Sequence, residues 1–252
     1  VVNPRAPRPN QPISLSIEGS GLDFYTATIS WSVNGTVAKS GKGLKTFTIT
    51  AGGLGSRTTV RVVVTSENKT YTKTLVITPA EVDILWQGEG YVPPFYPGRS
   101  LWSKQSQLTL LAIPQGVGSQ ANLIYRWSKN GTVLGSLSGV GRNSLAISDN
   151  ILSKTQTFKV EVMSRQDTIL ASNSITLTPR SPSLLVYENT PLYGYMFHQE
   201  ISGAYVLREP EVTFTSFPLF FTASSRDSLT GYKWRTNNAT TETKNAVTYR
   251  AP

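Results

Sequence analysis

The chain has 252 residues and a formal net charge of +9. It contains no cysteine, which excludes disulfides, thiolate metal sites and a cysteine nucleophile. The composition is globular, but the charged share of 15% lies below the roughly 25% of average soluble proteins. Neither an apolar run long enough to span a membrane nor a signal-peptide pattern is found, so we expect no membrane span; if the protein is secreted, its signal has already been removed.

Two stretches of the chain read almost alike. WSVNGTV begins at Trp31, and WSKNGTV begins at Trp127. Downstream, TFTIT (46–50) corresponds to SLAIS (144–148), and VRVVV (60–64) to FKVEV (158–162). Each run alternates apolar and polar residues with period 2, and clusters of Gly, Asn, Ser or Asp separate the runs. The pattern predicts an all-β chain of repeated sandwich domains, each of about 100 residues.

The middle copy is predicted to be complete. Its expected strands, in chain order, are A (about 82–87), B (107–113), C (123–129), C′ (133–135), E (143–148), F (157–164) and G (169–178). We expect three domains, at 1–79, 80–179 and 180–252, of which the first lacks a full strand A and the third lacks F and G.

The third copy is recognised from three correspondences. YENTPLYG (187–194) answers YVPPFYPG (91–98), YKWRTNN (232–238) answers YRWSKNG (125–131), and NAVTYRAP (245–252) answers NSLAISDN (143–150). Trp31, Trp127 and Trp234 then hold the position of the strand C aromatic that fills the space between two sheets, so we predict that they are core residues. The predicted fold class is a tandem array of immunoglobulin-like β-sandwich domains.

Six segments together carry a resemblance that covers nearly the whole chain. They are TISWSVNG, SRTTVRVVV, ITPAEVDILW, YVPPFYPG, NLIYRWSKNGTVLG and NTPLYG. In these the chain resembles a family of secreted tandem Ig-like or PKD-like domain proteins of ultra-small (candidate phyla) bacteria, often encoded near type IV pilus genes. The resemblance implies an extracellular or cell-surface location and a role associated with a pilus or the envelope. It implies no catalytic or binding residues.

The Asn-Gly-Thr triplets at Asn34 and Asn130 have two readings. Asn-Gly favours the positive φ angles of a two-residue hairpin turn, which the connection between strands C and C′ needs. The same triplets are acceptor sequences for N-glycosylation. We favour the turn.

The sequence offers little for catalysis. His198 is the single histidine, and it lies in an aromatic loop where no nucleophile elbow is found. The acidic residues form neither a dense oxygen run nor a marked pair. We therefore expect no enzyme activity, no cofactor and no metal site.

Basic residues are concentrated in residues 1–79, which hold nine Lys or Arg and three Asp or Glu. They could form a patch that attracts an anionic envelope polymer or nucleic acid. A solvated, solubilising surface is the simpler reading, and we favour it. The candidate residues are Lys39, Lys42, Lys45, Arg57, Arg61, Lys69 and Lys73.

Two loops rich in aromatic residues are the other candidate surface. Rigid aromatic side chains could stack on sugars, bases or a partner protein, or they could fill the joint between consecutive domains. We favour the joint, because the loop recurs at an equivalent place in two copies. The candidate binding residues are Trp86, Tyr91, Phe95, Tyr96, Trp102, Tyr193, Tyr195 and Phe197.

The sequence thus favours a non-enzymatic structural or adhesion protein, a rod of Ig-like domains at the cell surface or on a pilus. Incomplete outer domains could complete one another by strand addition and build filaments. The expected partners are proteins, including copies of the same chain or a pilus. The alternative is a module that binds anionic envelope glycan or DNA through the basic first domain and the aromatic loops, with nucleic acid the less favoured ligand.

Overall fold

A computed structural model describes residues 1–19, 22–67, 69–92, 98–119, 122–148, 150, 152, 154–221, 232–236, 239–242 and 244–250. These residues are organised in antiparallel sheets and form no α-helix. The chain divides into two compact units. Unit 1 comprises 1–85, 111–145 and 156–176, and unit 2 comprises 86–110, 146–155 and 177–252. The prediction of an all-β chain of tandem β-sandwich domains is confirmed, while the three domain boundaries stay a prediction.

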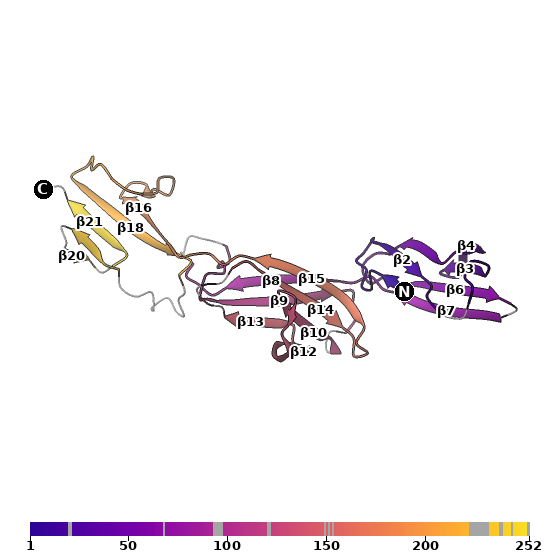
Figure 1. Cartoon of the computed structure of the whole chain (residues 1–252). Coiled ribbons are helices and arrows are strands. Elements are labelled where there is room, and N and C mark those ends of the chain that lie inside the picture. The colour runs from indigo at the N-terminus through magenta and orange to yellow at the C-terminus, as the bar shows by residue number, and fades with distance from the viewer. Residues whose placement is uncertain are drawn as a thin grey trace. The chain divides into compact units, whose positions relative to one another are not determined.

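The first seven strands form one sandwich in unit 1. They are β1 (Val2–Asn3), β2 (Pro12–Ser16), β3 (Thr28–Val33), β4 (Thr36–Lys42), β5 (Thr46–Thr50), β6 (Thr58–Ser66) and β7 (Lys69–Ile77). One sheet has the order β1-β2-β5 and the other the order β4-β3-β6-β7; β2 and the four strands of the second sheet are labelled in Figure 1. Their shared core buries Ile13 and Leu15 of the first sheet against Trp31, Val60 and Val62 of the second.

The next strands repeat this order. They are β8 (Glu81–Gly88), β9 (Gln107–Gln115), β10 (Ile124–Lys129), β11 (Thr132–Val133), β12 (Gly139–Val140), β13 (Ser144–Ser148), β14 (Gln156–Met163) and β15 (Ile169–Leu177), with a 3₁₀ turn, η2, at Gly135–Leu137. The sheets run β8-β9-β13 and β11-β10-β14-β15, and β12 also pairs with β10. With β8 as strand A, these are the orders A-B-E and C′-C-F-G of an immunoglobulin-like sandwich.

Unit 2 holds the third set of strands. They are β16 (Ser183–Thr190), β17 (Gly194–Tyr195), β18 (Glu211–Leu219), β19 (Trp234–Thr236), β20 (Ala239–Glu242) and β21 (Ala246–Arg250). The order β17-β16-β18-β21 adds β17 to an A-B-E sheet, and the hairpin β19-β20 occupies the positions of C and C′. Within the residues that the structure describes, no third strand pairs with this hairpin.

One sequence correspondence proves wrong in detail. Tyr187 lies inside strand β16, whereas Tyr91, its proposed counterpart, follows the end of β8. Counted from the first residue of strand A, which is Glu81 in β8 and Ser183 in β16, Tyr193 corresponds to Tyr91. The sequence similarity of YENTPLYG and YVPPFYPG therefore aligned part of a strand with a loop.

The three tryptophans make the same contact in each set of strands. The indole N–H of Trp31 donates to the carbonyl of Leu44, that of Trp127 to Arg142, and that of Trp234 to Lys244, each at 2.9 Å. Each accepting carbonyl lies shortly before strand E. Trp31 and Trp127 are fully buried in the core, and Trp234 is half-buried. The bond ties strand C of one sheet to strand E of the other.

The Asn-Gly dipeptides form the predicted turns between C and C′. Asn34 and Asn130 have φ angles of 49° and 50°, and the glycines that follow them also have positive φ. The asparagines do more than turn the chain, because each side chain reaches strand F. The Oδ1 atom of Asn34 accepts the N–H of Thr59, and that of Asn130 accepts the N–H of Thr157, both at 2.9 Å.

Candidate functional site

The predicted basic residues lie on both faces of the sheet β4-β3-β6-β7. Residues directly opposite each other on neighbouring antiparallel strands share a face. Lys42 is opposite Thr28 and Arg61 opposite Ser32, on the outer face. Lys39 is opposite Trp31 and Lys73 opposite Val62, on the face that carries the buried core.

The remaining basic candidates are spread along the same strands and the turns that join them. Lys45 precedes β5, with its ammonium 5.3 Å from the centre of the Phe24 ring. Arg57 precedes β6, and Lys69 begins β7. Anion binding by this set of residues stays a prediction.

The aromatic candidates of the first loop have different surroundings. Trp102 is only 2% exposed and belongs to the core. Trp86, on β8, is half-buried under the guanidinium of Arg99, whose central carbon lies 3.8 Å from the ring centre. Phe95 and Tyr96 lie outside the described residues. Of this loop, Tyr91 is the aromatic residue that faces a pocket.

The aromatic residues of the second loop pack against one face of the sheet β17-β16-β18-β21. Rings of Tyr187, Tyr195, Phe197 and Phe217 form a four-membered cluster with centroid separations between 5.2 and 6.1 Å. Phe217 is buried at the base, while Tyr195 and Phe197 keep 40% and 44% of their surface exposed. Tyr193 is 74% exposed and lies outside this cluster.

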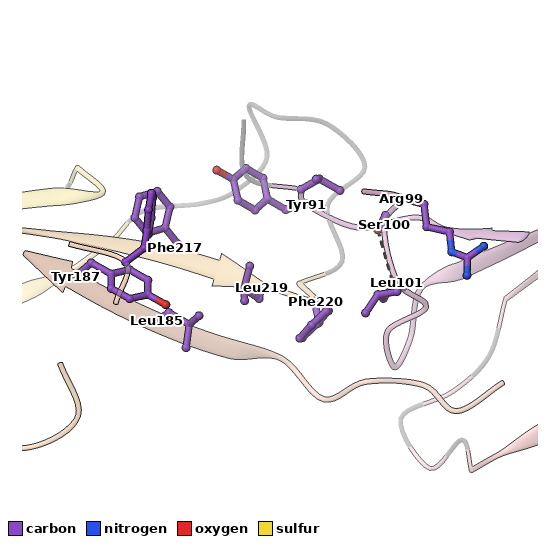
Figure 2. Close-up of a pocket in the computed structure, with 11 residues that line it drawn as sticks. Tyr91, Arg99, Ser100, Leu101, Leu185, Tyr187, Phe217, Leu219 and Phe220 are labelled. Atoms are coloured by element: carbon purple, nitrogen blue, oxygen red, sulfur yellow. Dashed lines mark hydrogen bonds between the residues drawn. The ribbon is translucent and has the colours of Figure 1, made fainter. Parts of the chain in front are cut away.

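A pocket of about 190 Å³ lies beside this aromatic cluster, within unit 2. Its wall is apolar, with one charged residue, Arg99. Figure 2 shows Tyr187 and Phe217 at one end and Arg99 at the other, with the guanidinium pointing away from the rings. The lining residues are Tyr91, Val92, Arg99, Ser100, Leu101, Leu185, Tyr187, Phe197, Phe217, Leu219 and Phe220.

Two glycines allow the wall of the pocket to form. A Cβ atom on Gly88 would come within 2.5 Å of the Leu101 carbonyl oxygen, and one on Gly90 within 3.2 Å of the Phe221 carbonyl oxygen. Gly88 therefore needs glycine for close approach of the backbone, whereas at Gly90 a side chain would require its neighbours to shift by a few tenths of an ångström. The N–H of Gly88 donates to the carbonyl of Ser100 at 2.9 Å, and the N–H of Tyr91 donates to the carbonyl of Phe221 at 3.1 Å.

Phe220 adopts an unusual backbone conformation in this wall. Its φ is +61°, in the left-handed region, which costs a residue with a side chain about 1 to 2 kcal/mol. Such strain persists where the surroundings determine the conformation, and it concentrates at functional sites. Next to the pocket, the pKa of the Tyr232 phenol is raised, first by burial and then by the neighbouring Tyr91 phenol.

The described residues offer little reactive chemistry. No group of three or more His, Asp or Glu residues that could hold a metal ion is found among them, and none of their helices could cross a membrane. His198 is exposed and follows Phe197 in the second loop. The described lining of the pocket can bind through apolar contact and one guanidinium.

Of the eleven lining residues, Tyr91 and Phe197 are among the predicted binding residues. Four others lie outside both aromatic loops, on or directly after strands β16 and β18: Leu185, Phe217, Leu219 and Phe220. A signal for part of them was present. The segment FTSFPLFF, beginning at Phe214, places large apolar residues on both faces of a strand, whereas β9 alternates more regularly. A strand that is apolar on both faces indicates that the second face is also covered.

Comparisons with known proteins show general likeness only. No family model matches the chain, and no curated protein matches it. The fibronectin(III)-like modules of Clostridium thermocellum CbhA are 11% identical, over 72% of this chain and 94% of that one, with a TM-score of 0.32. Three N-terminal domains of the Highly Immunogenic Outer Capsid protein (Hoc) of bacteriophage RB49 are 12% identical, over 100% and 85%, with a TM-score of 0.31. At these scores the fold assignment rests on the strand orders described above.

Proposed function

We propose that the protein is a non-enzymatic extracellular component that acts as a structural spacer and adhesion module. The observation that carries this proposal is the recurrence of one strand plan, twice in full and a third time as an A-B-E sheet with a C-C′ hairpin, each time with the same tryptophan hydrogen bond. Repeated sandwiches supply a scaffold, and function then depends on loops and exposed faces. Both the pocket and the exposed aromatic loop fit that division of roles.

The resemblance in sequence supports a narrower proposal. We propose a bacterial cell-surface location in association with a pilus or the envelope. The high share of Thr and Ser on the outer faces of the sheets suits an exposed protein. On the first sandwich, for example, Ser32 and Thr74 lie opposite Arg61 on such a face.

A bead assay tests the adhesive role. Latex beads coated with the full chain are mixed with intact cells of the source bacterium, and bound beads are counted by microscopy. We expect more of these beads to bind than control beads, which are coated with the same chain after it has been unfolded by heating. Equal binding of native and heated protein would contradict an adhesion function that depends on the fold.

We also propose assembly by strand addition. Among the residues that the structure describes, strand β19 pairs with β20 alone, whereas its counterparts β3 and β10 each pair with a further strand, β6 and β14. A strand from another copy could add to this two-stranded sheet, because strand addition at a sheet edge supplies main-chain hydrogen bonds. Sedimentation over a concentration series should show oligomers at micromolar protein, and a monomer at every concentration would refute this assembly.

The alternative function is binding of an anionic envelope glycan or DNA. Lys42 and Arg61 favour it, since both lie on the outer face and neither has an ion pair in the part of the chain that the structure describes. Retention on immobilised cell-wall polymer or DNA is measured across a salt series. Loss of retention at modest salt, and in a Lys42→Gln, Arg61→Gln double variant, supports this function. Absence of retention at low salt excludes it.

A further inference from the structure

We propose that the unit 2 pocket binds one aromatic side chain of a partner protein, presented on an acidic, extended segment. This inference rests on the proposed adhesion function and names the chemistry of its partner. It goes beyond the aromatic loops found in the sequence, since the floor of the pocket comes from Leu185 on β16 and from Leu219 on β18.

The size of the pocket selects its occupant. An enclosed apolar cavity of about 150 Å³ accepts benzene, whereas sites for whole small molecules measure roughly 300 to 1,000 Å³. At about 190 Å³, this pocket matches a single ring with its methylene group. Aromatic anchors that enter such pockets supply much of the affinity of protein interfaces.

The wall offers the contacts that a ring prefers. Tyr91, Tyr187 and Phe217 present ring faces or edges, and offset or edge-to-face packing against them stabilises an aromatic guest beyond simple burial. Gly88 and Gly90 allow the first loop to lie close to Leu101 and Phe221, and two backbone hydrogen bonds hold it there. Segments fixed in this way have less freedom to lose when a partner binds.

Arg99 determines the charge of the partner. It is the single charged residue of the described lining, and the structure pairs its guanidinium with the Trp86 ring and with no carboxylate of the described residues. Figure 2 shows this guanidinium beyond Ser100, away from Tyr187 and Phe217. A carboxylate that reaches Arg99 therefore lies further along the partner chain than the ring, as an extended segment of about 3.3 Å per residue allows.

The test is a titration of the isotope-labelled full chain with short peptides, followed by NMR. The probe is acetyl-Gly-Phe-Asp-Asp-Gly-amide, and two comparison peptides replace its Phe by Ala or both its Asp by Asn. We expect saturable shifts at about millimolar peptide, as suits one small anchor. The shifts should map to Tyr91, Leu101 and Leu219. The peptide with Ala should cause no saturable shift, and the peptide with Asn should bind about two- to fivefold more weakly.

Two neighbouring leucines give a matched pair of variants. Leu185→Phe adds volume inside the pocket and should weaken binding at least about tenfold, because the site is already closely lined. Leu184→Phe makes the same change on the adjacent residue of β16, which is 53% exposed and does not line the pocket, so binding should be unchanged. Arg99→Gln should abolish the preference for Asp over Asn in the peptide.

Several results would overturn the proposal. They are equal binding of the Phe and Ala peptides, shifts that map outside the pocket, and equal affinity of the Leu185→Phe and Leu184→Phe variants. The mapping uses the unaltered protein, so it decides the matter even if a variant fails to fold. If beads adhere but no peptide binds, the proposed pocket function is refuted and the spacer and adhesion function stands. If the peptide binds but beads do not adhere, the adhesion function is refuted and the binding activity of the pocket stands.

Discussion

Asn130 allows the strongest quantitative prediction, because its side chain and its backbone conformation can be tested separately. Its Oδ1 accepts the N–H of Thr157, and its own N–H donates to the Thr157 carbonyl. Asn130→Gly removes the side-chain acceptor but tolerates the φ of 50°, so it should cost about 1 kcal/mol, the value of one hydrogen bond. Asn130→Ala loses the same bond and adds left-handed strain of about 1 to 2 kcal/mol, for a total of about 2 to 3 kcal/mol.

Amide hydrogen exchange measures these costs at single residues. The buried Val160, in the middle of strand β14, reports opening of the sandwich. Its exchange should be about fivefold faster in Asn130→Gly and more than about thirtyfold faster in Asn130→Ala, following the conversion of free energy to population. Asn34 has the same geometry with Thr59, so Val62 should show the same ranking in the Asn34 variants. Equal effects of Ala and Gly at either site would refute the account of the turn.

Three further predictions follow from other contacts. Trp127→Phe should lower the free energy of unfolding by about 2 to 3 kcal/mol, because it removes the hydrogen bond to the Arg142 carbonyl and leaves a cavity where the fully buried indole was. A loss under about 0.5 kcal/mol in urea denaturation would contradict a stabilising role of this hydrogen bond. Burial acts to raise the pKa of Glu161, but hydrogen bonds and charges of Lys159 and Arg126 outweigh it and lower the pKa. The stability that Glu161 contributes is therefore present above the ordinary glutamate pKa and is lost as the pH falls through the lowered pKa. Glu161→Gln should flatten the acid limb of a plot of stability against pH. An unchanged acid limb would count against a stabilising role of the contacts with Lys159 and Arg126. Gly90→Ala should disturb the amide signals of Tyr91 and Ser100, since the new Cβ meets the Ser100 hydroxyl at 3.1 Å, whereas Gly53→Ala, with open space around it, should leave them in place; the opposite pattern would refute the reading of the loop.

The strands could be predicted well because their signal is local. Alternation in FKVEV places Phe158, Val160 and Val162 on one face, and the structure buries all three. The predicted strands of the middle copy agree with β8, β9, β10, β13, β14 and β15 to within about two residues at each end. Short elements such as β12 and η2 carried too few residues for any period to be read.

The pocket could be predicted only in part, because it depends on contacts between distant segments. Aromatic content marked Tyr91 and Phe197, but nothing local relates Tyr91 to Leu185 or to Phe220. Composition also could not separate Trp102, which is buried, from Trp86, which lies under Arg99. Likewise, the triplet at Asn130 indicates a turn in the sequence. The hydrogen bond from Thr157 of strand F to its side chain could not be predicted, because it depends on the pairing of β10 with β14.

The central claim is that this chain works outside the cell as part of a surface structure. Immunogold electron microscopy of intact source cells, with antibodies raised against the purified chain, tests it most directly. The account predicts gold particles on the outer surface or along surface filaments of unpermeabilised cells. Labelling that appears only after the cells are opened, and then in the cytoplasm, would contradict it.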